Sequence, residues 1–125
     1  MKTKLKTSNP LRTYFNLINF QFKLSEQEMD VLEFFVKRYF DFKNIKKDDV
    51  SVLAETVIFN MIFLKGEKKN CRELLSINVK PFHNIIMHLK NKGILGIEDG
   101  VTKIHPVFLL NPNTTEITFV LDVSK

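Results

Sequence analysis

Apolar residues recur every three or four positions in two stretches of the chain, residues 26–41 and 79–92. This spacing gathers them on one face of an α-helix, so each stretch predicts a helix with one buried side. Ser25 and Glu28 predict a capping box at the start of the first helix. The expected inward residues are Met29, Leu32, Phe35, Val36, Tyr39 and Phe40 in the first helix, and Phe82, Ile85, Ile86 and Leu89 in the second. Water-facing positions expected in the first helix are Glu33, Lys37 and Arg38.

A second capping pattern precedes the later helix. Asn70 and Glu73 have the N-x-x-E spacing, which predicts a short helix over residues 71–76 with Leu74 and Leu75 facing inward. The preceding residues 65–70 are charged and contain Gly66, so we expect a loop there.

A tight turn joins the two helices. Ile77 is apolar and can pack between them, and Asn78 can cap the second. Pro81 suits the first turn of that helix, where amide hydrogens have no intrahelical partner. Gly93 predicts its end.

A β-hairpin is expected next. The β-prone runs ILGIE and VTKIH flank Asp99–Gly100, and both positions of a two-residue hairpin turn need positive φ. The predicted order of elements in residues 70–106 is therefore helix, turn, helix and hairpin.

The remaining segments have less regular patterns. Residues 1–12 are expected to form a basic, mobile arm, and 13–24 a short helix followed by an extended piece. Asp48 or Asp49 can cap a helix that carries Val50, Leu53, Ala54, Val57 and Ile58. Residues 57–64 are apolar on nearly every side, which leaves helix and strand both open. The alternating residues 115–123 predict a strand that adds to the hairpin sheet or pairs across a dimer with the aromatic N-terminal segment.

These elements predict a mainly α fold with a small β-hairpin (α+β). We divide the chain into an N-terminal basic and aromatic arm (1–24), a helix-turn-helix and hairpin domain (25–110) and a C-terminal strand or tail (111–125). The 125 residues fit one compact domain, and 44% hydrophobic residues suffice for a core rich in the 12 Phe.

Composition narrows the functional classes. The longest apolar run, TVIFNMIFL, is too short to span a bilayer, so we expect no membrane partner. The basic N-terminus is not followed by an apolar signal region, and the single Cys71 cannot form an internal disulfide. Both features favour a cytoplasmic protein.

Positive charge is concentrated in one block. Residues 65–92 contain seven Lys or Arg and two Glu, which accounts for the whole net charge of +5. Such a block attracts phosphate, although a solvated Lys-rich face is the alternative.

The helix–turn–helix–hairpin order resembles the winged helix-turn-helix family of DNA-binding domains. The resemblance covers about a third of the chain. The ending LKNKGIL is similar to the close of recognition helices in MarR-like regulators and plasmid replication initiators, and the order of LSEQE, motif and KIHPVFL resembles small winged-helix proteins of tailed bacteriophages. One departure is the additional apolar segment 50–64 ahead of the motif. The matching positions are Leu74, Leu75, Ile77, Asn78, Phe82, Ile86, Leu89, Gly93, Ile94 and Leu95, with the hairpin tip at Asp99–Gly100.

The resemblance implies that helix 79–92 enters the major groove of duplex DNA. The implied base-facing residues are Lys80, His83, Asn84, Met87 and His88. The implied backbone contacts are Lys65, Lys68, Lys69, Arg72, Lys90 and Lys103. Each of these is otherwise a surface residue, and the reading face lacks Arg, the commonest specific base contact.

Enzyme chemistry is not indicated. His83 and His88 are five residues apart, which is wrong for two metal ligands on one helix face. None of the four glycines forms a phosphate-binding loop, and Cys71 lies in a structural helix, so we expect no catalysis, metal or cofactor. We therefore expect a DNA-binding regulator of transcription or replication that forms a homodimer or higher oligomer through its Phe-rich N-terminal segment and C-terminal strand. The alternative is a phage virion or assembly component that uses the same fold to bind protein.

Overall fold

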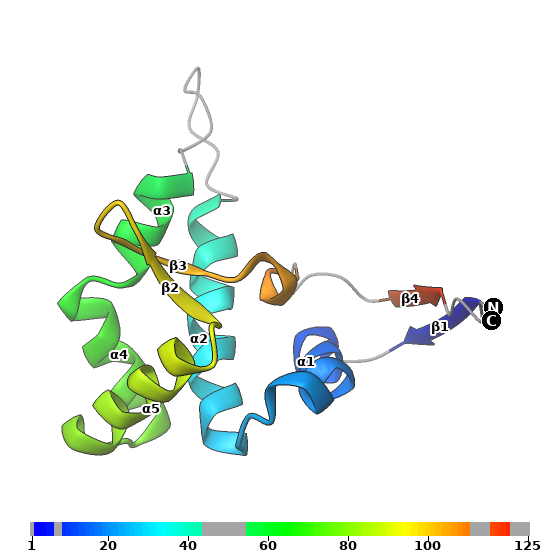
Figure 1. Ribbon diagram of the computed structural model, residues 1–125, viewed down its shortest axis with the longest axis horizontal. Helices are drawn as coiled ribbons and strands as arrows, with labels where there is room; N and C mark the ends of the chain where they lie inside the picture. The colour runs from blue at the N-terminus through cyan, green and yellow to red at the C-terminus, as the bar shows by residue number, and fades with distance from the viewer. Residues whose placement is uncertain (1, 7–8, 44–54, 111–115, 121–125) are drawn as a thin grey trace.

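A computed structural model of the chain describes residues 2–6, 9–43, 55–110 and 116–120. These form five α-helices and two separate two-stranded antiparallel sheets (Figure 1). The helices are α1 (Pro10–Phe22), α2 (Glu26–Lys43), α3 (Glu55–Ile62), α4 (Lys65–Leu75) and α5 (Val79–Asn91). The strands are β1 (Lys2–Lys6), β2 (Leu95–Glu98), β3 (Val101–Ile104) and β4 (Glu116–Val120), and a short 3-10 helix covers Pro106–Phe108.

Helix α2 is the central element. In Figure 1 it runs through the middle of the helical body, with α4 and α5 on one side and α1 on the other. The predicted capping box starts it: the Ser25 N–H donates to Glu28 Oε1 over 2.9 Å, and the Glu28 N–H donates to Ser25 Oγ over 3.1 Å. Phe35 is fully buried, and its ring lies beside Phe63 and beside Phe82 of α5. The apolar face of α2 therefore holds the other helices together, as its periodicity predicts.

Helix α1 packs on α2 through apolar and charged contacts. Leu11 and Phe15 are buried, which places residues 10–22 with the helical body. The expected short helix with an extended piece after it is wrong, because the helix continues to Phe22. Glu33 was expected to face water, but it is 8% exposed because Arg12 reaches it across 21 residues, with Nε–Oε2 at 2.9 Å.

Helix α4 begins earlier than the sequence indicates. The expected loop over residues 65–70 is the first half of α4, so Asn70 lies inside a helix rather than capping one. Tertiary contacts stabilise this first half. The Arg38 guanidinium of α2 donates to both carboxylate oxygens of Glu67, over 2.7 and 2.9 Å, and Cys71 is buried one turn later. Leu74 was expected to face inward and is instead 71% exposed.

The turn and the second helix follow the prediction more closely. Ser76 adopts positive φ, and the Ile77 N–H donates to the Arg72 carbonyl over 2.9 Å, which closes α4. Ile77 is buried between the helices. Asn78 holds the N-cap position of α5, but its side chain makes no capping hydrogen bond there. At the other end, Gly93 has a φ of +77° that suits a glycine, and it ends α5 as expected.

The hairpin forms as predicted. β2 and β3 pair antiparallel, with Leu95 opposite Ile104 and Glu98 opposite Val101. Asp99 and Gly100, at the turn between them, both have positive φ. Residues 57–64, left open between helix and strand, contain the end of helix α3. The expected cap at Asp48 or Asp49 lies outside the described residues.

The C-terminal strand has a different partner from either expectation. β4 pairs with β1 of the same chain, with Lys2 opposite Val120 and Lys6 opposite Glu116. Figure 1 shows this ribbon beside α1, on the side of the body away from α4 and α5. Part of the segment expected to be a mobile arm is therefore a strand.

Candidate nucleic-acid interface

Helix α5 separates its residues into an inner and an outer face. The inner face carries Phe82, Ile85, Ile86 and Leu89, all buried, as the periodicity predicts. In a helix, residues that follow a given residue by three, four, seven or eight positions lie on the same face as that residue. All five predicted base-facing residues lie on this outer face and are exposed: Lys80, His83, Asn84, Met87 and His88.

The outer face of α5 is not uniformly polar. Met87 is 41% exposed, and Val79 at the start of the helix is 65% exposed. Val79 was not among the predicted site residues, because its position in the first turn gave no reason to place it on the surface. The surface can therefore contact both hydrogen-bonding groups and apolar groups of a ligand.

Helix α4 carries a basic stripe. Its four Lys and Arg residues lie at positions 65, 68, 69 and 72, which fall on one side of a helix, while Glu67 and Cys71 occupy the side that faces α2. Residues 65–92 contain two acidic residues. One of them, Glu67, pairs with Arg38 of α2 and so lies on the side of α4 away from the stripe. The other, Glu73, is 3.9 Å from Lys69 and largely exposed. The stripe consists of Lys65, Lys68, Lys69 and Arg72.

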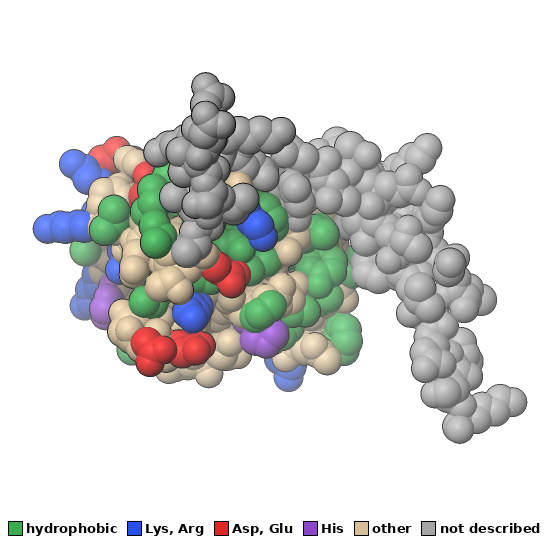
Figure 2. Space-filling model, turned by 90° about the horizontal axis from the view of Figure 1, so that it is seen from above, with side chains coloured by type: hydrophobic (Ala, Val, Ile, Leu, Met, Phe, Trp, Pro, Cys, Tyr) green, Lys and Arg blue, Asp and Glu red, His purple; other side chains and the backbone are tan. Residues whose placement is uncertain are grey.

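Most of these cations have no acidic partner. Within the described part of the chain, no ion pair within 4 Å involves Lys65, Lys68 or Arg72, nor Lys80 or Lys90 of α5. In Figure 2, Lys and Arg side chains project from the end of the body where α4 and α5 lie in Figure 1, with a histidine among them. Unpaired cations at one end create a positive potential that favours a polyanionic ligand.

Two lysines near this region have local partners. Lys92 contributes to the basic block in the sequence, but its Nζ lies 3.1 Å from Glu28 Oε1 and donates to the Lys23 carbonyl over 2.9 Å. Burial alone would raise the pKa of Glu28. The hydrogen bonds from Ser25 and the Lys92 ammonium outweigh burial and hold this pKa below its ordinary value. Lys92 is therefore a structural residue.

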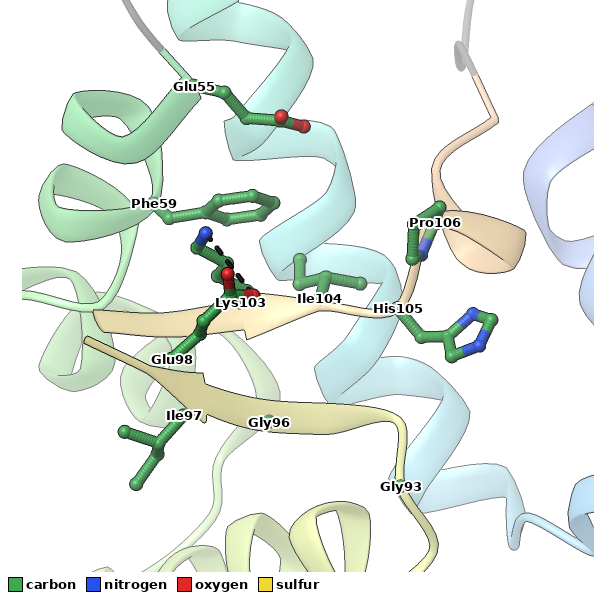
Figure 3. A pocket seen from close by; sticks show the side chains of 10 residues that line it. All are labelled: Glu55, Phe59, Gly93, Gly96, Ile97, Glu98, Lys103, Ile104, His105 and Pro106. Carbon is green, nitrogen blue, oxygen red and sulfur yellow. Dashed lines mark ion pairs between the residues drawn. The ribbon is translucent and has the colours of Figure 1, made fainter. Parts of the chain in front are cut away.

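Lys103 lies on the hairpin, away from the α5 outer face. Its Nζ is 3.6 Å from Glu98 Oε2, and its side chain extends toward Phe59 of α3 (Figure 3). These residues border a hollow of about 380 Å³ between α3 and the hairpin, while Ile97 points to the opposite side of β2. The structure thus brings ten of the eleven predicted contact residues to α4 and α5 and leaves Lys103 in a different setting.

The described residues contain no group of three or more His, Cys, Asp or Glu placed to hold a metal ion. Burial raises the pKa of the Cys71 thiol to about 12, because its effect is larger than that of the nearby Arg72 charge, which lowers the pKa. The thiol is therefore protonated. Within the same residues, the longest apolar helices are too short or too polar to cross a membrane.

Comparisons of the chain with protein-family models, with curated proteins and with solved structures each find no match.

Proposed function

We propose that this chain binds duplex DNA through the surface formed by α4 and α5, in the manner of a winged helix-turn-helix protein. In this proposal α5 is the recognition helix, α4 is the supporting helix and β2–β3 is the wing. The turn between the helices is three residues long, and the hairpin follows α5 directly, as that arrangement requires. The proposed role is regulation of transcription or replication.

The observation that carries the proposal is the combination of an exposed polar face on α5 with unpaired cations on α4. A helix with its side chains is about 10–12 Å across, which matches the roughly 12 Å width of the major groove. With α5 in the groove, we propose that the basic stripe of the neighbouring α4 contacts the phosphate backbone that borders the groove. Phosphate contacts then position the helix, and α5 reads the bases.

Individual residues have distinct proposed roles. Asn84 can accept from and donate to adenine, and Lys80 can donate to guanine. Met87 can contact a thymine methyl group, while His83 and His88 can hydrogen-bond to base edges or phosphates. Lys103 is engaged by Glu98, so it contributes to the proposed interface only when that exposed ion pair opens.

A salt titration tests the proposal. Fluorescence anisotropy with a labelled duplex should show affinity that falls steeply between 50 and 200 mM salt, because each neutralised phosphate releases condensed counterions. Lys80→Glu and Arg72→Glu should each weaken binding by about tenfold or more. Lys43→Glu on α2 is the matched control, since it makes the same change in net charge outside the surface. A lack of binding at low salt, or equal losses for all three variants, would contradict the proposal.

A second candidate function is a protein-interaction module, as in a virion or assembly component. The observation that favours it is the exposed Val79 and Met87 on the α5 face, together with the exposed Leu74 at the end of α4. Apolar residues of this kind suit a protein partner better than a phosphate backbone. Stable higher oligomers without duplex affinity at low salt would support this function over DNA binding.

A further inference from the structure

The outer face of α1 exposes apolar side chains far from the proposed DNA surface. Phe20 is 75% exposed, the highest value among the large hydrophobic residues that the structure describes, and Leu17 is 41% exposed. The two lie three residues apart and so share one face of the helix. Helix α1 is already attached to the body by buried Leu11 and Phe15 on its other side. The exposure of Leu17 and Phe20 is therefore not needed for the packing of this chain.

Charge indicates what can cover this face. Between Pro10 and Phe22 the only charged residue is Arg12, and its guanidinium is occupied by Glu26, Asp30 and Glu33. The outer residues Asn16, Leu17, Phe20 and Gln21 are neutral, so two copies of the face can meet without like-charge repulsion. Two copies that met through α4 and α5 would instead bring unpaired cations together.

The strands beside α1 favour the same partner. β1 and β4 form a ribbon of only two five-residue strands, a size that is marginally stable alone. Within the described strands, the outer edges of β1 and β4 have no neighbour. A β4 edge can pair antiparallel with an identical edge across a two-fold axis, which is the symmetry of a homodimer, whereas two β1 edges would bring Lys2, Lys4 and Lys6 of each copy together.

We infer that a second copy of this chain docks on the outer face of α1. The two α1 helices pack against each other antiparallel, with Leu17 and Phe20 of each copy near the two-fold axis, and the β1–β4 ribbons lie next to the contact. The apolar contact is small, so the dimer is expected to be weak. The α4–α5 surfaces then lie at the outer ends of the dimer.

Analytical ultracentrifugation from 5 to 500 μM tests this arrangement. The native chain should approach dimer mass at the upper concentrations, and Phe20→Glu and Leu17→Glu should each weaken association at least tenfold. Ile97→Glu is the matched control for Phe20→Glu, because it replaces an apolar residue of similar exposure on β2, outside both α1 and the α4–α5 surface. A native chain that stays monomeric at 500 μM would overturn the inference, as would an equal loss in the control variant. So would association with an unrelated protein or with neutral vesicles in the absence of self-association.

A cross-linking experiment gives a second readout. Residues near a two-fold axis can form a symmetric disulfide when their Cα atoms are within about 7 Å. Phe20→Cys or Leu17→Cys should therefore yield a covalent dimer under mild oxidation, whereas Ile97→Cys should not. The native Cys71 is buried and holds its proton, so it does not compete. Circular dichroism establishes that each variant is folded, and folded Cys variants that remain uncross-linked at 500 μM would overturn the inference. Neither experiment involves DNA, so its outcome is independent of the proposed DNA binding.

Discussion

Two regions of this molecule use basic residues in opposite ways. Between α1 and α2, Arg12 contacts three carboxylates, and Lys37 adds a 2.7 Å pair to one of them, Glu33. On α4 and α5, cations such as Arg72 and Lys80 point outward with no carboxylate within 4 Å in the described part of the chain. Partly buried, paired charges contribute to folding, whereas exposed unpaired charges contribute little to folding and remain available to a ligand.

The comparison implies that stability and the proposed DNA binding can be separated by mutation. Variants in the α1–α2 cluster should change the free energy of unfolding and leave the binding surface intact. Variants on the α4–α5 surface should do the reverse.

The largest effect is expected for Arg12→Met. This change removes the guanidinium from Glu33, a carboxylate that is only 8% exposed, and should lower the free energy of unfolding by about 2–3 kcal/mol. Urea denaturation followed by circular dichroism measures the change. Lys37→Met is the matched control, because its exposed i,i+4 pair should contribute about 0.5 kcal/mol or less. Similar losses in the two variants would contradict the importance of the Arg12 cluster.

A smaller loss is expected for Lys92→Met. Its ammonium group neutralises the buried Glu28 carboxylate, so its removal should cost about 1–2 kcal/mol in urea denaturation. The corresponding change at Lys90, which has no such partner, should cost about 0.5 kcal/mol or less. A larger loss for the Lys90 variant would show that the two lysines have been assigned the wrong roles.

The Glu28 carboxylate should also make stability depend on pH. Its pKa is lower in the folded state than the ordinary value of 4.5, so the folded state favours the charged form. The resulting stabilisation is complete above about pH 5 and is lost as the pH falls through the folded pKa. Glu28→Gln should flatten the decline in unfolding free energy as the pH falls below about 5. An unchanged pH profile in this variant would assign the acid sensitivity to other carboxylates.

The smallest effect on stability is expected for Arg72→Met and Lys80→Met. Both side chains are unpaired, so the free energy of unfolding should change by at most about 0.5 kcal/mol. Arg72→Met should nevertheless reduce the slope of log affinity against log salt by about 1, the loss of one phosphate contact, whereas Lys80→Met, which removes a proposed base contact, should weaken binding with a smaller change in slope. Anisotropy titrations at several salt concentrations measure the slope. If the slope is unchanged while affinity falls, the lost contact is to a base and not to a phosphate.

The sequence predicted best those features that depend on neighbours in the chain. The capping box at Ser25 and Glu28 and the turn at Asp99–Gly100 need only a few consecutive residues. The inner face of α5 follows from its apolar spacing, and that spacing also places Lys80 and Asn84 on the outside. Local rules were therefore sufficient for the predicted base-facing surface.

Features that depend on distant residues were predicted poorly. The first half of α4 is polar in sequence, and it is stabilised by the contact between Glu67 and Arg38, 29 residues away. The spacing of Glu67, Cys71 and Leu75 at four-residue steps is the signal that could have revealed its inner face. Glu33 gave no such signal, because only the fold brings Arg12 to it. The pairing of β1 with β4 joins the two ends of the described chain, which no local pattern encodes.

NMR titration of the ¹⁵N-labelled chain with a duplex at low salt tests the central claim most directly, because it locates the contact as well as detecting it. The proposal predicts that the largest chemical-shift changes occur in amides of α4, the intervening turn and α5, while amides of α1 change little at concentrations below the dimer Kd. Shift changes centred on α1 or on the hollow between α3 and the hairpin would contradict the claim, as would a spectrum that the duplex leaves unchanged.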